Sequence, residues 1–198
     1  MNTIHFVTSN RGKVSSLQNR LGKNAIVERL RLDVPEIQAD SAEVIARFKA
    51  RYAYKQVRLP LLMQDSAFHV RALYGFPGPY IKYINETIGP EGLLDLMKGK
   101  ADRYCHFEHV AVYIDGRGKE HVFRSGEESS GSIATERYEP QNVQSWSDLW
   151  QIFIPHWASR PLAALSREEI DRHEQEDDKQ SDLYRFAEWY KSHVGVIQ

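Results

Sequence analysis

The stretch FVTSNRGK, residues 6–13, joins a short apolar run to an amphipathic segment. The apolar run covers residues 4–7, and Thr8-Ser9-Asn10 is a cluster of residues that favour turns and helix N-termini. Apolar residues then recur at helical spacing, at Val14, Leu17 and Leu21. These residues predict a strand, a turn and a helix in direct succession.

The turn after this strand has two interpretations: it caps a helix that carries a surface lysine, or it holds a phosphate. A helix N-terminus attracts anions through its unpaired N–H groups and partial positive charge, and Gly12 and Lys13 would add a close backbone and a full charge. The stretch is not a Walker A loop, because no glycine precedes Gly12 by five residues and Val14 stands where Ser or Thr is required. Local sequence alone leaves both interpretations open.

Length and composition indicate an ordinary globular protein. The chain has 198 residues, 41% hydrophobic and 27% charged, so we expect about one domain, or one domain with a lobe, and predict a single domain over residues 1–198. A net charge of −1 argues against nucleic-acid binding, which normally requires a basic face. The single cysteine, Cys105, excludes an intramolecular disulfide, and without a visible signal peptide we expect the cytoplasm. No apolar stretch approaches the roughly 20 residues that span a membrane.

Compact or alternating apolar patterns predict the other strands. They are expected over residues 25–32, 59–66 and 149–155, with a long β-hairpin over 103–125. The strand at 59–66 ends in Asp65 and Ser66, which suggests that its C-terminal end meets a site. Together with the intervening helices, these strands predict an α/β fold around a central mixed sheet.

Capping signals and helical periodicity predict the helices. One begins at a capping box formed by Asp40 and Glu43. Its apolar face is expected at Val44, Ile45, Phe48 and Tyr52. Other helices are expected over 90–97, after the capping box of Ser166 and Glu169, and over 181–194. The last of these has an aromatic face that should cover the core.

Two carboxylates and two lysines suggest phosphoryl chemistry. Asp65 ends an apolar strand, where a charge is costly unless it is paired or bound to a metal. Phosphoryl transfer needs oxygen ligands for Mg²⁺, cations for phosphate oxygens, and a carboxylate that orients or deprotonates water. The residues that could supply these groups together are Asn10, Lys13, Glu36, Lys49 and Asp65. A zinc site is not indicated, because His106 and His109 would point to opposite faces of their strand.

Four stretches together carry a family pattern. The most distinctive is ALYGFPGPYIKYINETIGPEGLLDLM at residues 72–97. FVTSNRGK, DVPEIQADSAEVIARFKA (33–50) and QDSAF (64–68) accompany it, and GSIATE (131–136) also fits. In order and spacing, these stretches resemble the inosine triphosphate pyrophosphatase family over about residues 1–135.

The resemblance implies a fold and an activity. The fold would be elongated, with a central mixed sheet and flanking helices forming two lobes around a nucleotide cleft, usually in a homodimer. The activity would be Mg²⁺-dependent hydrolysis of a nucleoside triphosphate to the monophosphate and pyrophosphate. Members of the family favour deaminated purines such as inosine and xanthosine.

The resemblance also assigns site residues. The triphosphate loop would consist of Thr8, Ser9, Asn10, Arg11, Gly12 and Lys13, with Lys13 taking part in catalysis. Glu36 and Asp65 would bind magnesium, and Asp65 would also act on the attacking water. Lys49 and Ser66 would contact the substrate. On this assignment FVTSNRGK is a phosphate loop.

Several positions depart from the family pattern near the expected metal site and base pocket. An acid usually precedes the aspartate, where this chain has Gln64, and glycine usually stands at the position of Ala67. The family's base pocket, Phe-Gly-Trp/Tyr-Asp-Pro, aligns with residues 147–151. Trp150 or Trp146 could stack on a base instead, and a structural core role for the tryptophan is the alternative.

The C-terminal segment departs further. Ile170 and residues 174–176 (Glu-Gln-Glu) stand where the family has a lysine and Ser-His-Arg. A buried glutamate beside a triphosphate would repel it by several kcal/mol. Either this segment folds away from the site, or the substrate is not the usual one.

Two functions therefore stay open. The first is a nucleoside triphosphate pyrophosphatase with non-standard base specificity. The second is a nucleotide-binding sensor or partner protein that has lost most of its hydrolysis, as Gln64 and the acidic segment suggest. The joint presence of Lys13, Glu36, Lys49 and Asp65 favours the enzyme. Turnover that requires Mg²⁺ and Asp65 would distinguish the two functions.

Overall fold

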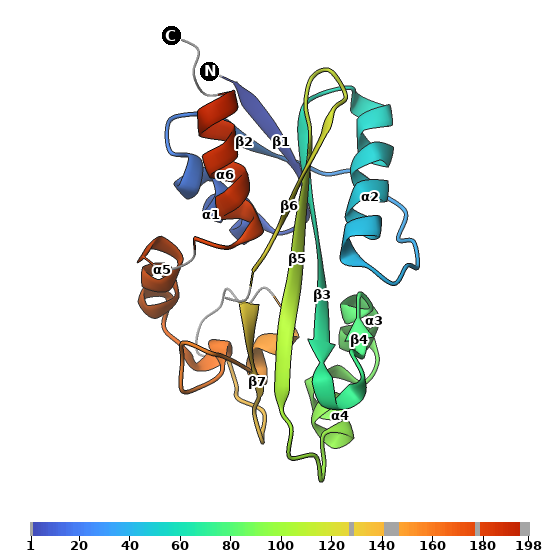
Figure 1. The fold of residues 1–198 in the computed structure, drawn as a ribbon, viewed down its shortest axis with the longest axis vertical. Coiled ribbons are helices and arrows are strands. Elements are labelled where there is room, and N and C mark those ends of the chain that lie inside the picture. Colours follow the sequence, from blue (N-terminus) through green and yellow to red (C-terminus); the bar gives the residue numbers. More distant parts are fainter. Residues whose placement is uncertain (1, 127–128, 141–146, 177–178, 195–198) are drawn as a thin grey trace. The chain divides into compact units, whose positions relative to one another are not determined.

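A computed structural model of the chain describes residues 2–126, 129–140, 147–176 and 179–194. The strands are β1 Thr3–Val7, β2 Ile26–Leu30, β3 Leu61–Val70, β4 Pro77–Gly78, β5 Tyr104–Ile114, β6 Glu120–Arg124, β7 Ser130–Ile133 and β8 Phe153–Pro155. The α-helices are α1 Arg11–Leu21, α2 Ala42–Val57, α3 Ile81–Glu86, α4 Gly89–Leu96, α5 Arg167–Glu176 and α6 Asp182–His193. Figure 1 shows these elements in chain order. Among the described residues, none of the helices combines the length and apolarity that crossing a bilayer requires.

The strands form one mixed sheet, as predicted. Its order is β2-β1-β3-β5-β7-β8, with β4 paired to β3 and β6 paired to β5. β1 runs parallel to β2 and to β3, whereas β5 runs antiparallel to β6 and β7, and β7 antiparallel to β8. Because the first three strands are parallel, their carboxyl ends meet at one edge, where ligands bind in open α/β sheets.

The chain divides into two compact units. The first contains residues 1–65, 109–125 and 180–198, and the second contains 66–108 and 126–179. All the predicted catalytic and metal-binding residues, at positions 13, 36 and 65, belong to the first unit. That the whole chain acts as a single domain stays a prediction.

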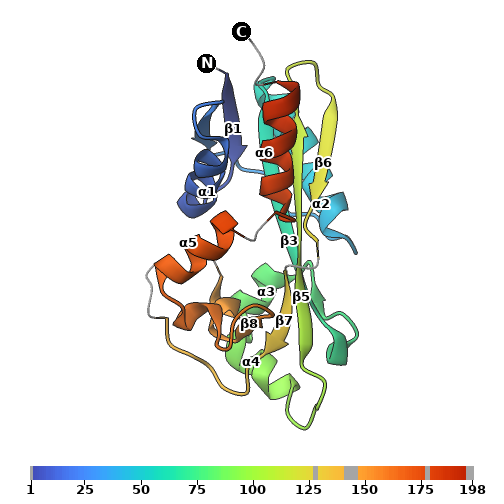
Figure 2. The ribbon, with the colours of Figure 1, turned by 60° about the vertical axis from the view of Figure 1, so that its left-hand side comes forward.

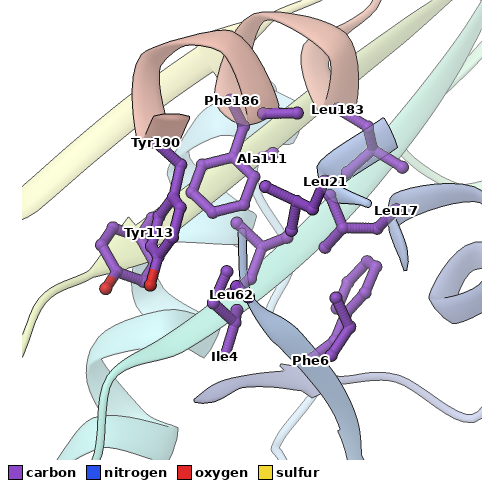
Figure 3. Packing of buried hydrophobic residues seen from close by; sticks show 13 residues of the cluster. Ile4, Phe6, Leu17, Leu21, Leu62, Ala111, Tyr113, Leu183, Phe186 and Tyr190 are labelled. Atoms are coloured by element: carbon purple, nitrogen blue, oxygen red, sulfur yellow. The ribbon is translucent and has the colours of Figure 1, made fainter. Parts of the chain in front are cut away.

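The core of the first unit lies between its strands and two helices. Its buried side chains include Ile4 and Phe6 of β1, Leu17 and Leu21 of α1, Leu62 of β3, Tyr113 of β5 and Phe186 and Tyr190 of α6. Figure 3 shows the aromatic rings of α6 facing this cluster, and Figure 2 shows α6 along the hairpin. The prediction that the last helix covers the core with its aromatic face is therefore confirmed.

Helix α2 differs from its prediction. Ser41, not Asp40, is the N-cap, because its side chain accepts the N–H of Glu43. The buried face consists of Ala42, Ile45, Ala46, Ala50 and Ala53, whereas Val44 is 52% exposed and Phe48 and Tyr52 are each 36% exposed. The small alanine side chains let the helix backbone lie close to its neighbours, which leaves the larger residues outside.

Ion pairs fix α2 against the hairpin. Arg47 on α2 donates to Glu120 of β6 at 2.7 Å, and Arg124 of β6 donates to Glu43 at the start of α2, also at 2.7 Å. These contacts fix the rotation of the helix about its axis and therefore the direction of Lys49, which lies two residues from Arg47. Figure 1 shows α2 on the opposite side of the first-unit strands from α1 and α6.

The second unit has its own core. Phe68, Phe107 and Phe153 pack there in tilted and edge-to-face arrangements, with the Phe68 and Phe107 ring centroids 4.5 Å apart. The segment expected to be a strand over 149–155 is a 3-10 turn at Asp148–Gln151 followed by β8. The capping box of Ser166 and Glu169 is confirmed, since each backbone N–H donates to the other side chain.

Candidate functional site

The FVTSNRGK stretch forms the predicted strand, turn and helix. Asn10 is the N-cap of α1: its Oδ1 accepts the N–H of Gly12 at 2.8 Å and of Lys13 at 3.4 Å. The Asn10 N–H in turn donates to Thr8 Oγ1 at 3.1 Å. Because Asn10 already uses two N–H groups of the helix, an anion at this turn would depend on the helix dipole and on nearby cationic side chains.

Lys49 connects the two predicted metal ligands. Its Nζ lies 2.7 Å from Asp65 Oδ2 and also forms an ion pair with Glu36 Oε1. The side chains of Lys49 and Asp65 are each 13% exposed, and Glu36 is 39% exposed. Burial alone would lower the pKa of Lys49, but Asp65 and Glu36 more than offset this and raise it, so Lys49 stays charged.

A hollow of about 510 Å³ lies beside this group, within the usual range for small-molecule sites. Thr8 and Ser9 of the loop, Glu36 and Lys49 all line it, together with apolar side chains such as Val7 and Met63. Residues that are far apart in the sequence therefore meet in one pocket. The position of Asp65 differs from its prediction, because β3 continues past it to Val70 and Asp65 lies inside the strand.

Lys13 points into a group of charges in the same unit. Burial lowers its pKa, Asp182 and Asp65 act to raise it, and Lys49 lowers it further, with a net decrease. His109 of β5 lies beside it, and burial together with the Lys13 charge lowers the pKa of His109 to about 3. His109 is therefore neutral at ordinary pH. Sequence reasoning did not place Asp182 or His109 at this site, because neither belongs to a recognisable motif.

Three arginines add positive charge next to the loop. Arg29 Nη1 donates to the Ser9 carbonyl at 3.4 Å, and Arg31 lines the pocket. Burial, followed by the charges of Arg31 and Arg11, lowers the pKa of Arg29. Within the described part of the chain, no ion pair joins these three guanidinium groups to a carboxylate, so their charges remain available to an anion. Alternation at position 29 of β2 and position 31, just past its end, was a signal that could have revealed two of them.

Other predicted site residues lie elsewhere. Ser66 follows Asp65 in β3, is partly buried and belongs to the second unit. Trp150 is only 9% exposed and packs in a second-unit cluster with Ala163, Leu165 and Ile170. This burial favours the core role over base stacking for Trp150. Trp146 and the side chains of residues 174–176 lie outside the described residues.

Comparison with known proteins identifies the family of the chain. A sequence model of the Ham1 family matches residues 4–177. The chain is 38% identical to the dITP/XTP pyrophosphatase of Methanopyrus kandleri over 192 residues, 96% of this chain and 97% of the relative. It is 36% identical to the dITP/XTP pyrophosphatase of Thermococcus kodakarensis over 192 residues, 96% of this chain and 98% of the relative.

Solved structures support the fold. The structure of the Staphylococcus aureus Ham1 protein has a TM-score of 0.76 and 22% identity, over 96% of this chain and 99% of that chain. A Ham1 protein from Coxiella burnetii has the same TM-score at 20% identity, over 97% and 100% of the two chains. The likeness to the family that the sequence motifs predicted is confirmed, and the chain belongs to the Ham1 family.

Proposed function

We propose that the protein is a Mg²⁺-dependent nucleoside triphosphate pyrophosphatase, which releases pyrophosphate and a nucleoside monophosphate. The observation that carries the proposal is the pairing of Lys49 with both Glu36 and Asp65, because Lys49 and Glu36 line the same pocket as Thr8 and Ser9. Relatives that are 36–38% identical over almost the whole chain are named dITP/XTP pyrophosphatases, which supports the same reaction.

The residues present fit a magnesium ion. Glu36 and Asp65 both approach the Lys49 ammonium, so two carboxylates already converge on a positive charge. The described residues contain no group of three or more acidic, histidine or cysteine side chains that could hold a metal. Mg²⁺ is usually bound through one or two carboxylates together with waters and substrate phosphates, so two carboxylates suffice. When bound, it would neutralise charge on the phosphate oxygens.

The chemical step is attack of water on the α-phosphorus. The new bond joins the water oxygen to that phosphorus, the bond to the bridging oxygen breaks, and pyrophosphate leaves with the electron pair. We propose that Asp65 accepts the proton of the water, while Lys49 holds the Asp65 carboxylate in place. Lys13 and Arg31 would neutralise the phosphate chain.

We further propose that base specificity differs from that of typical family members. Ile170 replaces the family's lysine and is 5% exposed inside a core cluster with Trp150. Neither side chain is placed to read a base. A site that lacks the polar groups that hydrogen-bond a base discriminates weakly among bases.

The second candidate function, a nucleotide-binding sensor or partner with weak or no hydrolysis, rests on the same loss of base-reading groups. Product analysis distinguishes it from the enzyme. The protein would be incubated with standard, deaminated and modified nucleoside triphosphates, in the presence of either Mg²⁺ or EDTA. The same reactions would be run with the variant Asp65→Asn and with a control variant, Asp95→Asn, whose carboxylate is 68% exposed. Pyrophosphate release that needs Mg²⁺ and disappears only in Asp65→Asn supports the enzyme. Thermal stabilisation by a nucleotide without any product would instead establish the binder.

The family resemblance also leads us to propose a cytoplasmic homodimer. Light scattering coupled to size exclusion would test the dimer, with a monomer mass at micromolar concentration as the contrary outcome.

A further inference from the structure

Asp182, the first residue of α6, has a buried carboxylate. Its relative exposure is 2%, and it is the only acidic or basic side chain among the described residues that is buried to this degree. A buried carboxylate is costly unless it is hydrogen-bonded and balanced by a positive charge. The hydrogen bond and the positive charge come from two residues in other parts of the first unit, Gln64 and Lys13.

Gln64 supplies the hydrogen bond. Its Nε2 donates to Asp182 Oδ2 at 2.6 Å. Gln64 immediately precedes Asp65 on β3, so the amide joins the start of α6 directly to the proposed catalytic strand. A glutamate at position 64 would instead place two carboxylates against each other without a donor between them. The amide at 64 and the acid at 182 therefore depend on each other.

Lys13 supplies the positive charge. Among the charges that act on Lys13, Asp182 has the largest favourable effect, ahead of Asp65. Helix α1, which carries Lys13, packs directly on α6. The N-terminus of α6, capped by Ser181, also favours a carboxylate at its first residue.

The charged side chains of the site alternate in sign as a result. Asp182 and Asp65 both act electrostatically on Lys13, Asp65 pairs with Lys49, and Lys49 pairs with Glu36. Each lysine thus interacts with two carboxylates.

We propose that Asp182 is a positioning residue for Lys13, and that the hydrogen bond from Gln64 holds the Asp182 carboxylate in place for this role. The inference rests on the proposed function. Without the charge of Asp182, Lys13 would have one carboxylate instead of two to fix its ammonium toward the phosphates. The function of Asp182 is therefore electrostatic, and a carboxylate at position 64 should restore it.

A charge-exchange experiment tests this. The variants are Asp182→Asn, Gln64→Glu and the double variant that carries both changes. The double variant again has one acid and one amide at these two positions, but with the two groups exchanged. The control is Glu188→Gln, which removes an exposed carboxylate from the same helix. Each variant is measured for pyrophosphate release and for its thermal unfolding midpoint.

We expect Asp182→Asn to lower kcat/KM by about 10-fold to 100-fold, mainly through KM, because a displaced phosphate-binding group costs this much. Gln64→Glu should also lose activity, since two acids then face each other. The double variant should recover to within about five-fold of the natural protein, which is the non-additivity expected of coupled residues. Glu188→Gln should be unchanged.

The pH profile supplies a readout that a purely structural role would not change. The charged or titratable groups that act on Lys13 are Asp182, Asp65, Lys49 and His109. Removing the Asp182 charge lowers the pKa of Lys13, so the alkaline limit of kcat/KM should move to lower pH in Asp182→Asn and return in the double variant.

Two results would overturn the inference: losses that simply multiply in the double variant, or a normal pH profile and kcat/KM in Asp182→Asn. The thermal unfolding midpoints of the natural protein, the two single variants and the double variant measure the coupling between Gln64 and Asp182 independently of activity. If the natural protein released no pyrophosphate, the proposed function would fail, and the midpoints would still decide whether Gln64 and Asp182 are coupled.

Discussion

The Nζ of Lys49, on α2, lies 2.7 Å from Asp65 Oδ2, on β3, and the same ammonium pairs with Glu36 from the loop before α2. One lysine therefore holds two carboxylates at the edge of the pocket. We propose that Lys49 has two tasks in this arrangement: it neutralises the acids in the free protein, and it keeps Asp65 oriented when substrate binds.

Replacing Lys49 with glutamine should affect both tasks. We expect kcat/KM for pyrophosphate release to fall at least about 100-fold, because the proposed base loses its orientation. The free energy of unfolding should fall by about 1–3 kcal/mol, because two carboxylates lose their shared partner. Steady-state kinetics and urea unfolding measure the two effects. Lys55→Gln, at an exposed position of the same helix, is the control, and near-normal turnover by Lys49→Gln would contradict the proposed role.

Arg31 should contribute to substrate binding through its charge. We expect Arg31→Gln to raise KM by about three-fold to ten-fold at low salt with little change in kcat, since a charge near solvent contributes about 1 kcal/mol. The difference from the natural protein should shrink as ionic strength rises. Kinetics at two salt concentrations test this, with Arg117→Gln in the exposed hairpin turn as the control. An effect on kcat that is independent of salt would rule out this electrostatic role.

Local sequence predicted one half of the site well. FVTSNRGK contains the end of a strand, the turn, the cap and the start of the helix within eight residues, so short-range rules are enough to predict its backbone conformation. The convergence of Glu36, Lys49 and Asp65 is not local. Their chemistry suggested that they could act together, and the order and spacing of the family motifs then assigned them to one site. Physical patterns alone could not show that one ammonium would join both carboxylates.

The contacts that could not be predicted join distant segments or involve small side chains. Gln64 and Asp182 are 118 positions apart, and Asp182 looks in sequence like an ordinary first residue of a helix. Of the buried face of α2 only Ile45 was predicted, because alanines carry little apolar signal whereas the exposed Phe48 and Tyr52 carry much. The hydrophobic pattern of a helix therefore does not always indicate which of its faces packs against the sheet.

Trp150 provides a test of the core role against base stacking. We expect Trp150→Ala to lower the free energy of unfolding by about 3–5 kcal/mol, because it leaves a large cavity beside Ala163 and Leu165. Trp150→Phe should lose less stability and keep the same order of preference among nucleotide bases. Urea unfolding and the nucleotide panel measure these effects. A changed base preference in Trp150→Phe at unchanged stability would show that the indole contacts the base.

His109 should make the protein sensitive to mild acid. Burial and Lys13 lower the pKa of His109 from 6.5 to about 3, so the folded state holds this imidazole neutral while the unfolded chain can protonate it. Between these two values the unfolded state binds more protons. Stability should therefore fall as pH decreases from about 6.5, by up to about 1 kcal/mol per pH unit.

The window from pH 6.5 to 4.5 isolates the histidines. The pKa values of Glu43 and Glu120 lie below their usual 4.5, so these ion pairs weaken only at lower pH. Burial, and then His69, also lowers the pKa of His106, which adds a second contribution in the same window. Urea unfolding at several pH values should show that the free energy of unfolding of His109→Gln depends less steeply on pH than that of the natural protein. The control His156→Gln, at an exposed position, should leave this dependence unchanged. An unchanged slope in His109→Gln would show that this imidazole does not titrate with unfolding, and that Lys13 has a different neighbour in solution.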